Sequence, residues 1–137
     1  MTIELTIVTP EGRAFHGDVE SVVLPGVEGD FGVLENHEPF LTALQIGGLE
    51  VHTDEVRYGV VGTGFAEING TAVSVMVSTC EWADEIDVER AEKARERAKA
   101  ELERMRGTEE GEAAYQEYQE AYSRAVARVS VSEKFTK

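Results

Sequence analysis

Four arginines in the second half of the chain have the side-chain type and the spacing needed to bind an anion. Arg90 and Arg97 are seven residues apart and Arg124 and Arg128 are four apart, so each pair shares one face of a helix. Two such helices folded against each other could bring both pairs to one ligand, because guanidinium groups match phosphate oxygens. The alternative is a solvated face with local ion pairs, such as Asp87 with Arg90.

The other residues that could ligate a metal or act in catalysis are better explained as structural or solvated residues. The histidines, at positions 16, 37 and 52, lack the spacing of a zinc site. Segment 35–38 (Glu-Asn-His-Glu) could ligate a metal or transfer protons, but a solvated polar loop is the simpler interpretation. Cys80 with a distant histidine could form a nucleophile pair, although a buried cysteine at a strand end fits better. We therefore expect no catalytic residues and no metal site.

A cluster of acidic and apolar residues lies between positions 28 and 38. Its acidic members are Glu28, Asp30, Glu35 and Glu38, and they flank the apolar Phe31, Val33 and Leu34. Loops that mix apolar groups with charges of one sign often dock a basic partner. An ordinary charged loop explains the cluster equally well.

The charge of the chain excludes some partners. In 137 residues there are 27 acidic and 13 basic side chains, a formal net charge of −14. Nucleic acid and anionic lipid both repel such a polyanion. No apolar run reaches the roughly 18 residues that cross a bilayer. We therefore expect a soluble protein without nucleic-acid partners.

The elements that must position these residues fall into two parts, which we place at 1–84 and 85–137. Residues 1–80 hold 11 of the 13 glycines and all three prolines, with a net charge of −10, whereas residues 81–137 hold ten alanines and most of the basic residues. Gly and Pro mark turns, and Ala, Glu, Lys and Arg favour helices. A β module followed by an α module is predicted.

The first part shows the period of strands. Ile3, Leu5 and Ile7 alternate with polar residues, and Asn69-Gly70 suits a two-residue hairpin turn. Further β-branched or aromatic runs separated by turn residues predict a sandwich or barrel. These runs are 19–24, 31–34, 49–53, 56–61, 65–68 and 72–78.

The second part shows the period of helices. Asp87 can cap a helix, and Glu89 suits the first turn of that helix. Two narrow apolar stripes follow, with Gly107 as a stop and Thr108 as a new cap between them. The stripes are Ala91, Ala94, Ala98, Leu102 and Met105, then Ala114, Tyr118, Ala121, Ala125 and Val129. They predict an antiparallel helical hairpin that is only marginally stable by itself and must pack against another surface.

Several motifs, in order along the whole chain, resemble the epsilon subunit of bacterial and plastid F-type ATP synthases. They are Ile7-Val8-Thr9-Pro10, Leu24-Pro25-Gly26, Gly29-Asp30-Phe31-Gly32-Val33-Leu34, His37-Glu38-Pro39-Phe40-Leu41-Thr42-Ala43-Leu44, Gly64-Phe65-Ala66-Glu67-Ile68 and Ile86-Asp87-Val88-Glu89-Arg90-Ala91. The resemblance implies an α+β fold, an N-terminal antiparallel β-sandwich of about ten strands followed by a C-terminal antiparallel two-helix hairpin. It also implies a non-catalytic rotor subunit in the central stalk, which couples rotation to ATP synthesis and can restrain ATP hydrolysis.

The same resemblance implies partners and site residues. The partners would be the gamma subunit, the c-ring through Asp30 and His37, and the catalytic alpha/beta head when the hairpin is extended. Membrane contact would come only through the complex, at the cytoplasmic face of the bacterial plasma membrane or, alternatively, on the stromal side of the thylakoid. No cofactor would be required. Some members bind regulatory ATP, and the matching residues here are Glu81, Asp87, Arg90, Ala91, Arg97, Arg124 and Arg128.

The second helix of this chain differs in charge from the inhibitory helix of related subunits. Residues 109–129 carry five acids and only two arginines, so we expect weaker and more salt-sensitive inhibition than in a member with a basic tail.

Two other functions compete with this one. A ligand-binding β-sandwich that dimerises through its helices would explain the composition but not the ordered motifs. A metal-dependent enzyme would need His37.

Overall fold

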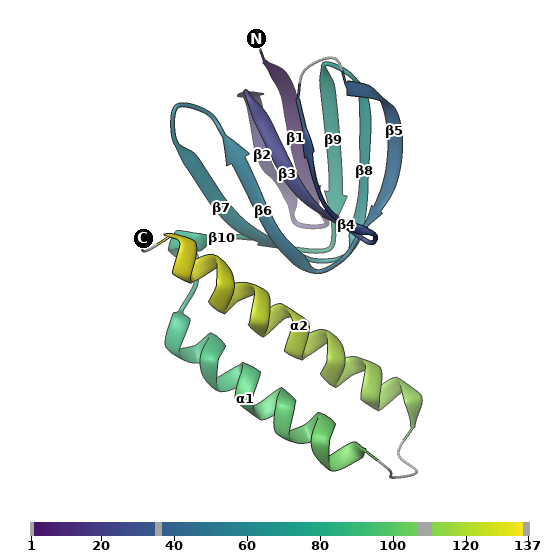
Figure 1. The fold of residues 1–137 in the computed structure, drawn as a ribbon, viewed down its shortest axis with the longest axis vertical. Helices are drawn as coiled ribbons and strands as arrows, with labels where there is room; N and C mark the ends of the chain where they lie inside the picture. Colours follow the sequence, from purple (N-terminus) through teal and green to yellow (C-terminus); the bar gives the residue numbers. More distant parts are fainter. Residues whose placement is uncertain (1, 35–36, 107–110, 136–137) are drawn as a thin grey trace.

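The computed structural model describes residues 2–34, 37–106 and 111–135, which form a ten-stranded β domain and two helices (Figure 1). The N-terminal strands are β1 (Ile3–Thr9), β2 (Gly12–Val19), β3 (Ser21–Gly26), β4 (Gly29–Val33) and β5 (His37–Leu44). They are followed by β6 (Gly47–His52), β7 (Val56–Val61), β8 (Gly64–Gly70), β9 (Ala72–Val77) and β10 (Cys80–Trp82). A short 3-10 turn, η1 (Ala83–Glu85), leads into α1 (Val88–Met105) and α2 (Glu112–Phe135).

The strands form a sandwich that is nearly closed. Their order is β10-β7-β6-β3-β5-β8-β9-β1-β2, with β4 paired to β3. β3 and β5 are joined by a single pair, Gly26 with Leu44, so the sheet folds over at this point. All pairs are antiparallel except β1 with β9, which is parallel. The predicted fold class is confirmed, with this one parallel pair as a refinement.

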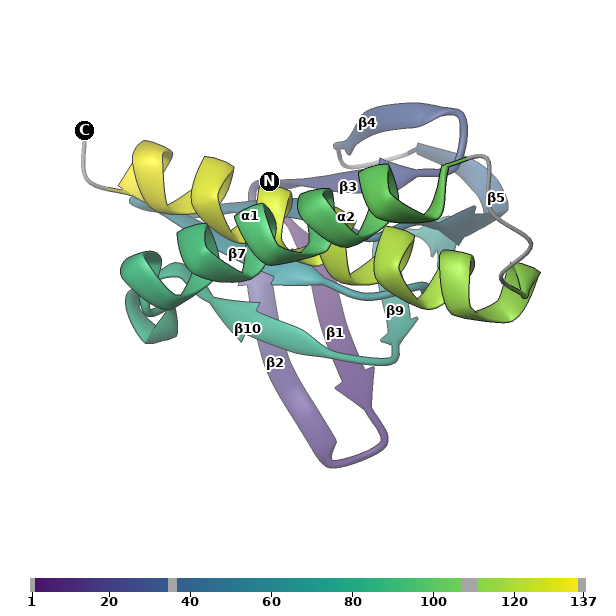
Figure 2. The same cartoon turned by 90° about the horizontal axis from the view of Figure 1, so that it is seen from below.

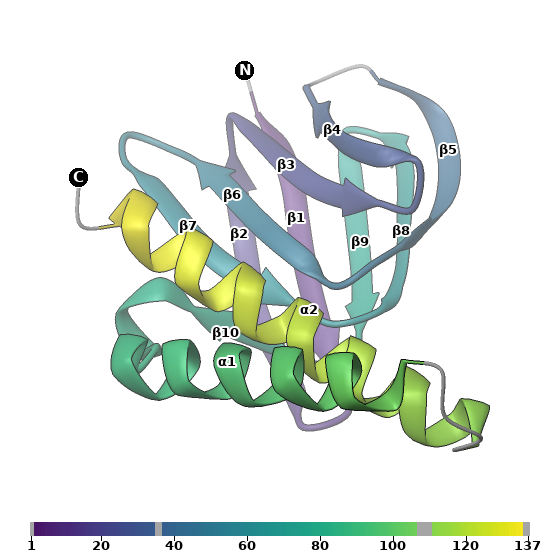
Figure 3. The same ribbon diagram turned by 60° about the horizontal axis from the view of Figure 1, so that its bottom comes forward.

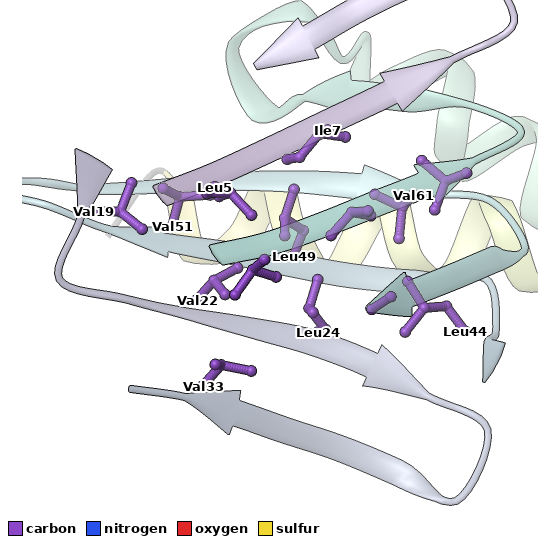
Figure 4. Close-up of a cluster of buried hydrophobic side chains, with 14 of the residues drawn as sticks. Leu5, Ile7, Val19, Val22, Leu24, Val33, Leu44, Leu49, Val51 and Val61 are labelled. Atoms are coloured by element: carbon purple, nitrogen blue, oxygen red, sulfur yellow. The ribbon is translucent and has the colours of Figure 1, made fainter. Parts of the chain in front are cut away.

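Alternating side chains fill the inside of the sandwich. Ile3, Leu5 and Ile7 of β1 are fully buried, as their period of two predicted. Figure 4 shows Leu5 and Ile7 among side chains from neighbouring strands, including Leu24 and Leu49. Each buried side chain of this kind contributes about 1.5–3 kcal/mol relative to full exposure.

The sequence analysis missed three strands. β2 is an edge strand whose side chains are mostly exposed, so it lacks the apolar alternation that marks a half-buried strand. β5 begins His-Glu-Pro, a polar segment that read as a loop, and β10 is only three residues long. The predicted run 19–24 is interrupted at Glu20, whose backbone N–H donates to the carbonyl of His52.

The predicted turn at Asn69-Gly70 is wrong by one residue. Asn69 pairs with Ala72, so Gly70 and Thr71 occupy the turn between β8 and β9. Gly70 has φ 66°, and both primed hairpin turns require a positive φ at this first central position. Glycine adopts this conformation without the steric cost that a side chain would add.

The helices form the predicted antiparallel hairpin, and α2 packs against the sandwich. Figures 1 and 3 show α2 between the strands and α1. The buried residues of α1 are Ala91, Ala98 and Met105, which belong to the predicted stripe. The predicted stop and cap at 107 and 108 lie outside the described residues. Neither described helix is long and apolar enough to cross a membrane.

A second apolar face on α2 anchors the hairpin. Ala127 and Val131 are buried in a small cluster with Val60 of β7 and Ala83 of η1. Viewed from below, the hairpin lies across the end of the sandwich near β7 and β10 (Figure 2). The hairpin was expected to need a supporting surface, and that surface is the part of the sheet formed by β6 and β7.

Candidate functional site

A cleft of about 480 Å³ lies where the start of α1, the C-terminal half of α2 and β10 meet. It brings together six of the seven residues that the sequence predicted as nucleotide ligands. These are Glu81, Asp87, Arg90, Ala91, Arg97 and Arg128. Residues that lie up to 47 positions apart in the chain thus line one cleft because the hairpin closes and docks on the sandwich.

The start of α1 is fixed by Asp87. Its carboxylate accepts the backbone N–H of Arg90 at 3.1 Å, which confirms the predicted cap. The local ion pair between Asp87 and the Arg90 side chain is not found among the described residues. Arg90 and Arg97 both line the cleft, and neither makes an ion pair in the part of the chain that the structure describes. Ala91 is buried at the base of the same turn.

Arg128 has a different environment, because its Nε donates to Oε1 of Glu81 at 2.7 Å. Both side chains are about one third exposed, so water partly screens the pair. The bond ties α2 to β10 directly beside the cleft. Glu81 therefore occupies a hydrogen-bonding position on Arg128 that a phosphate oxygen could otherwise take.

Arg124 lies outside this cleft. It lines two adjoining recesses, of about 260 and 410 Å³, that share Arg128 with the cleft. It is half-buried one helical turn before Arg128. The seven predicted residues thus surround one continuous region centred on Arg128, with Arg124 on the side facing the β9–β10 loop.

Trp82 marks the junction between sandwich and hairpin. Its indole is 94% shielded from solvent, with the guanidinium of Arg57 3.7 Å above the ring and Phe15 at 6.0 Å. Its backbone N–H donates to Glu85 at 3.2 Å. Nothing in the sequence indicated the contact between Trp82 and Arg57, because it joins distant positions in the chain.

Cys80 is half-buried at the first position of β10, as expected of a cysteine at a strand end. Burial raises the pKa of its thiol to about 11, partly offset by the nearby Arg57 and reinforced by Glu85 and Glu81. A thiol with such a pKa is a weak nucleophile at neutral pH. In the described residues no group of three or more His, Cys, Asp and Glu is placed to hold a metal ion.

The predicted c-ring contacts are separated by a strand. Asp30 is exposed beside the β3–β4 turn, whereas His37 begins β5, after the far end of β4 (Figure 3). Large apolar side chains are exposed on the same group of strands and turns, namely Val27, Leu34, Phe40 and Leu41. Glu35 and Asn36, part of the acidic cluster and of the metal alternative, lie outside the described residues.

A second apolar surface follows the register of three strands. Phe65 pairs with Met76 across β8 and β9, and Met76 pairs with Val8 of β1. Phe65 is 55% exposed and Met76 51%, so the row lies on the outside of the sheet. Contiguous exposed apolar side chains of this kind mark interaction surfaces.

Comparison with known proteins identifies two matching family models that together cover nearly the whole chain. Residues 2–83 match the beta-sandwich domain of the ATP synthase delta/epsilon chain, and residues 84–133 match the long alpha-helix domain of that chain.

Curated relatives and a solved structure agree with these models. The ATP synthase epsilon chain of Geobacter sp. strain M21 is 37% identical over 98% of this chain and 96% of its own, and that of Anaeromyxobacter dehalogenans is 42% identical over 96% and 98%. In a structure of Euglena gracilis mitochondrial ATP synthase with OSCP, F1 and c-ring, one chain superposes with a TM-score of 0.80 at 26% identity, covering 92% of this chain and 78% of that one. A chain from the Tetrahymena thermophila central stalk and c-ring has a TM-score of 0.57 at 14% identity and shows the fold alone.

Proposed function

The chain belongs to the ATP synthase delta/epsilon family, as an epsilon subunit of the F-type enzyme, and from this premise we propose that its hairpin is a nucleotide-sensitive regulatory element. The subunit itself is a non-catalytic part of the central stalk. The proposed element folds against the sandwich when ATP is bound, and restrains ATP hydrolysis when it extends towards the catalytic head.

The observation that carries this proposal is the cleft lined by Arg90, Arg97 and Arg128. Three guanidinium groups from two helices face one space, two of them without ion pairs in the described ranges. Phosphate is the ligand that best matches several guanidinium groups. Because α1, α2 and β10 all contribute, a ligand in this cleft would bind the docked hairpin and not the extended one.

The size of the effect follows from linkage. A ligand shifts a conformational equilibrium only by its differential affinity for the two forms. A hundredfold preference for the docked form would correspond to about 2.7 kcal/mol. The hairpin is held by small alanine contacts, a four-residue cluster and two partly exposed ion pairs, Arg128 with Glu81 and Lys134 with Glu50. A shift of that size is large enough to control such an element.

We assign the sandwich, 1–84, to assembly and the hairpin, 85–137, to regulation. The acidic and apolar surface that includes Asp30, Leu34 and Leu41, with His37 at its edge, would contact the polar loops of the c-ring.

The exposed row of Phe65, Met76 and Val8 suits the gamma subunit, since such a row needs an apolar partner. The complex would place the subunit at the cytoplasmic face of a bacterial membrane, in line with its bacterial relatives.

Contact of the extended hairpin with the alpha/beta head would be weak. Exposed side chains of α2 include several glutamates, and this face carries few cations to meet an acidic segment. Inhibition should therefore be modest and should fall as salt is added. A shortened chain that ends after Glu85 keeps all ten described strands and provides the comparison. Equal inhibition of the cognate head by both chains would remove the role of the hairpin.

The decisive experiment is an ATP titration of the full chain, followed by Trp82 fluorescence and by calorimetry. Arg128→Ala should abolish saturable binding, whereas Arg13→Ala, on β2 and outside the lining of the cleft, should leave it unchanged. Absence of calorimetric binding in the unaltered chain would overturn the nucleotide-sensitive role. The stalk assignment would stand, and the proposed gamma contact would then be tested by co-assembly with Phe65→Ser as the disrupting variant.

A further inference from the structure

A small recess joins the strand after the β3–β4 turn to the C-terminal half of α2. Its volume is about 110 Å³, and its lining includes Asp30 of β4, Glu50 of β6 and Lys134 of α2. Figure 3 shows α2 beside β6, with β3 and β4 following in the sheet. The exposed Asp30, which belongs to the proposed c-ring surface, thus shares this Asp30 recess with the hairpin.

Packing sets the position of α2 at the wall of the Asp30 recess. Val131 is buried and lies close over Gly48 of β6, where a Cβ would come within 3.3 Å of its Cγ2. Ala127, one helical turn earlier, is also buried against the sandwich. Lys134 follows Val131 by three residues and shares its side of the helix. The distance of Lys134 from the sheet therefore depends on whether α2 is docked.

The charges in the Asp30 recess are unequal. Among the described residues that line it, Lys134 is the one cation, and Asp30 and Glu50 are the two carboxylates. Nζ of Lys134 lies 3.5 Å from Oε2 of Glu50, while Oε1 of the same carboxylate lies 3.3 Å from Nε2 of His52. Asp30 makes no ion pair within residues 2–34, 37–106 and 111–135. One cation thus serves two carboxylates, and Asp30 is the one open to a partner.

Asp30 attracts Lys134 across the recess without direct contact. The screening length is about 8 Å at physiological ionic strength, so this attraction is only partly screened. It stabilises the docked hairpin alone, because Lys134 leaves the recess when α2 lifts from β6. A cation from a partner at Asp30 would cancel the attraction and repel Lys134. Partner binding at Asp30 and docking of the hairpin therefore oppose each other, and this coupling is reciprocal.

We propose that the Asp30 recess couples the c-ring surface to the hairpin: a basic side chain of the c-ring at Asp30 loosens the docked hairpin, and docking weakens that contact. This inference rests on the c-ring assignment in the proposed function. The attraction between Asp30 and Lys134 needs no partner and is tested separately. The side chain of Lys134 is 52% exposed, so we expect an effect of about two- to fivefold on the docking equilibrium.

The docking equilibrium can be measured by alkylation of a buried thiol. Cys80 is the one cysteine of the chain, so Cys80→Ala with Ala127→Cys leaves a single thiol, buried under α2, that reacts when the hairpin lifts. Val126→Cys, at an exposed position of the same helix, gives the unprotected rate. Asp30→Asn and Lys134→Gln should each raise the rate at position 127 about two- to fivefold. Circular dichroism verifies that each variant is folded.

The two changes together test whether Asp30 acts through Lys134. The effect of Asp30→Asn should disappear in a chain that carries Lys134→Gln, and it should fade in about 1 M salt, where the screening length is about 3 Å. Glu28→Gln removes the same charge from an exposed position in the same turn, outside the lining of the recess, and should change the rate less. Equal effects of Asp30→Asn with and without Lys134→Gln, or of Glu28→Gln and Asp30→Asn, overturn the inference.

The c-ring is then added as the partner. Alkylation at position 127 is compared between the chain bound to the gamma subunit and the chain bound to gamma and the detergent-solubilised c-ring. The ring should raise the rate about two- to fivefold, and much less with Lys134→Gln. An unchanged rate with the ring bound overturns the coupling. Retention of the ring at full affinity by Asp30→Asn overturns the c-ring assignment of Asp30 instead, while the result for the chain alone still stands.

Discussion

Arg128 of α2 donates through Nε to Oε1 of Glu81 in β10 at 2.7 Å, across 47 residues of sequence. The bond joins the hairpin to the sandwich and borders the cleft on one side and, on the other, the recess of about 260 Å³ that Arg124 also lines. Because a carboxylate and a phosphate oxygen compete for the same guanidinium, Glu81 both stabilises the docked hairpin and opposes anion binding.

Glu81→Gln should therefore have two effects of opposite sign. Loss of a half-exposed ion pair should destabilise docking by about 0.2–1 kcal/mol, seen as faster hydrogen exchange in α2. Release of Arg128 should raise the affinity for inorganic tripolyphosphate, measured by calorimetry. Glu92→Gln removes the same charge from an exposed position on α1 and serves as the control. An equal gain in both variants would show only a change in net charge.

Asp87→Ala should weaken the first turn of α1. The carboxylate accepts the N–H of Arg90, and loss of such a cap costs about 0.5–2 kcal/mol. Hydrogen exchange at the α1 amides measures the loss, and the affinity of the cleft should fall with it because Arg90 leaves its position. Asp84→Ala, three residues earlier and exposed, should change neither quantity.

Val131→Ala should detach α2 from the sheet more readily. Val131 is 3% exposed and packs with Val60, so the removed methyl groups should cost about 1–2 kcal/mol. Val126, 38% exposed on the same helix, gives the matched control. Urea unfolding monitored separately in the hairpin and the sandwich should show the loss in the hairpin. Equal effects of the two substitutions would exclude Val131 as an anchor.

Ser132→Ala should stabilise the hairpin. The Ser132 hydroxyl is buried on α2 and has no hydrogen-bond partner among the residues that the structure describes, and such a group costs about 1–3 kcal/mol. Ser130→Ala, at an exposed position of the same helix, carries the same gain in helix propensity. The difference between the melting temperatures of the two variants measures how much the buried hydroxyl destabilises the hairpin. A larger gain from Ser130→Ala would contradict the prediction.

Cys80 should react slowly and make the stability depend on pH at the alkaline end. Its pKa is about 11 in the folded protein because of burial, against 9.0 for the ordinary thiol. The unfolded chain therefore loses this proton first, so the stability contribution is complete below pH 9 and decreases as the pH rises towards 11. Alkylation by iodoacetamide should be faster in urea than in the native protein at pH 9. The chain with Cys80→Ala should lose this pH dependence.

The arrangement of the fold followed from local patterns, whereas the residues proposed to bind ATP came from the family resemblance. The alternation at Ile3, Leu5 and Ile7 can be recognised in the sequence because a half-buried strand has a period of two. The cap at Asp87 can also be recognised, because it involves only neighbouring residues. The family resemblance rests on motifs in order along the chain, and the matching family models confirm it. Local patterns failed at β2 and β10, where an exposed edge and a very short strand leave no period to detect.

Only the tertiary structure decided which charged groups meet. The sequence placed Arg124 and Arg128 on one helical face, and in the fold both line the same two recesses while only Arg128 also lines the cleft. Arg128 is bound by Glu81, while Arg124 faces the hydroxyls of Ser78 and Thr79. Such contacts depend on how α2 docks on the sheet through Ala127 and Val131, a surface set by long-range packing. Local periodicity determines which side of an element is apolar, and the partner of that side is fixed only when the whole chain has folded.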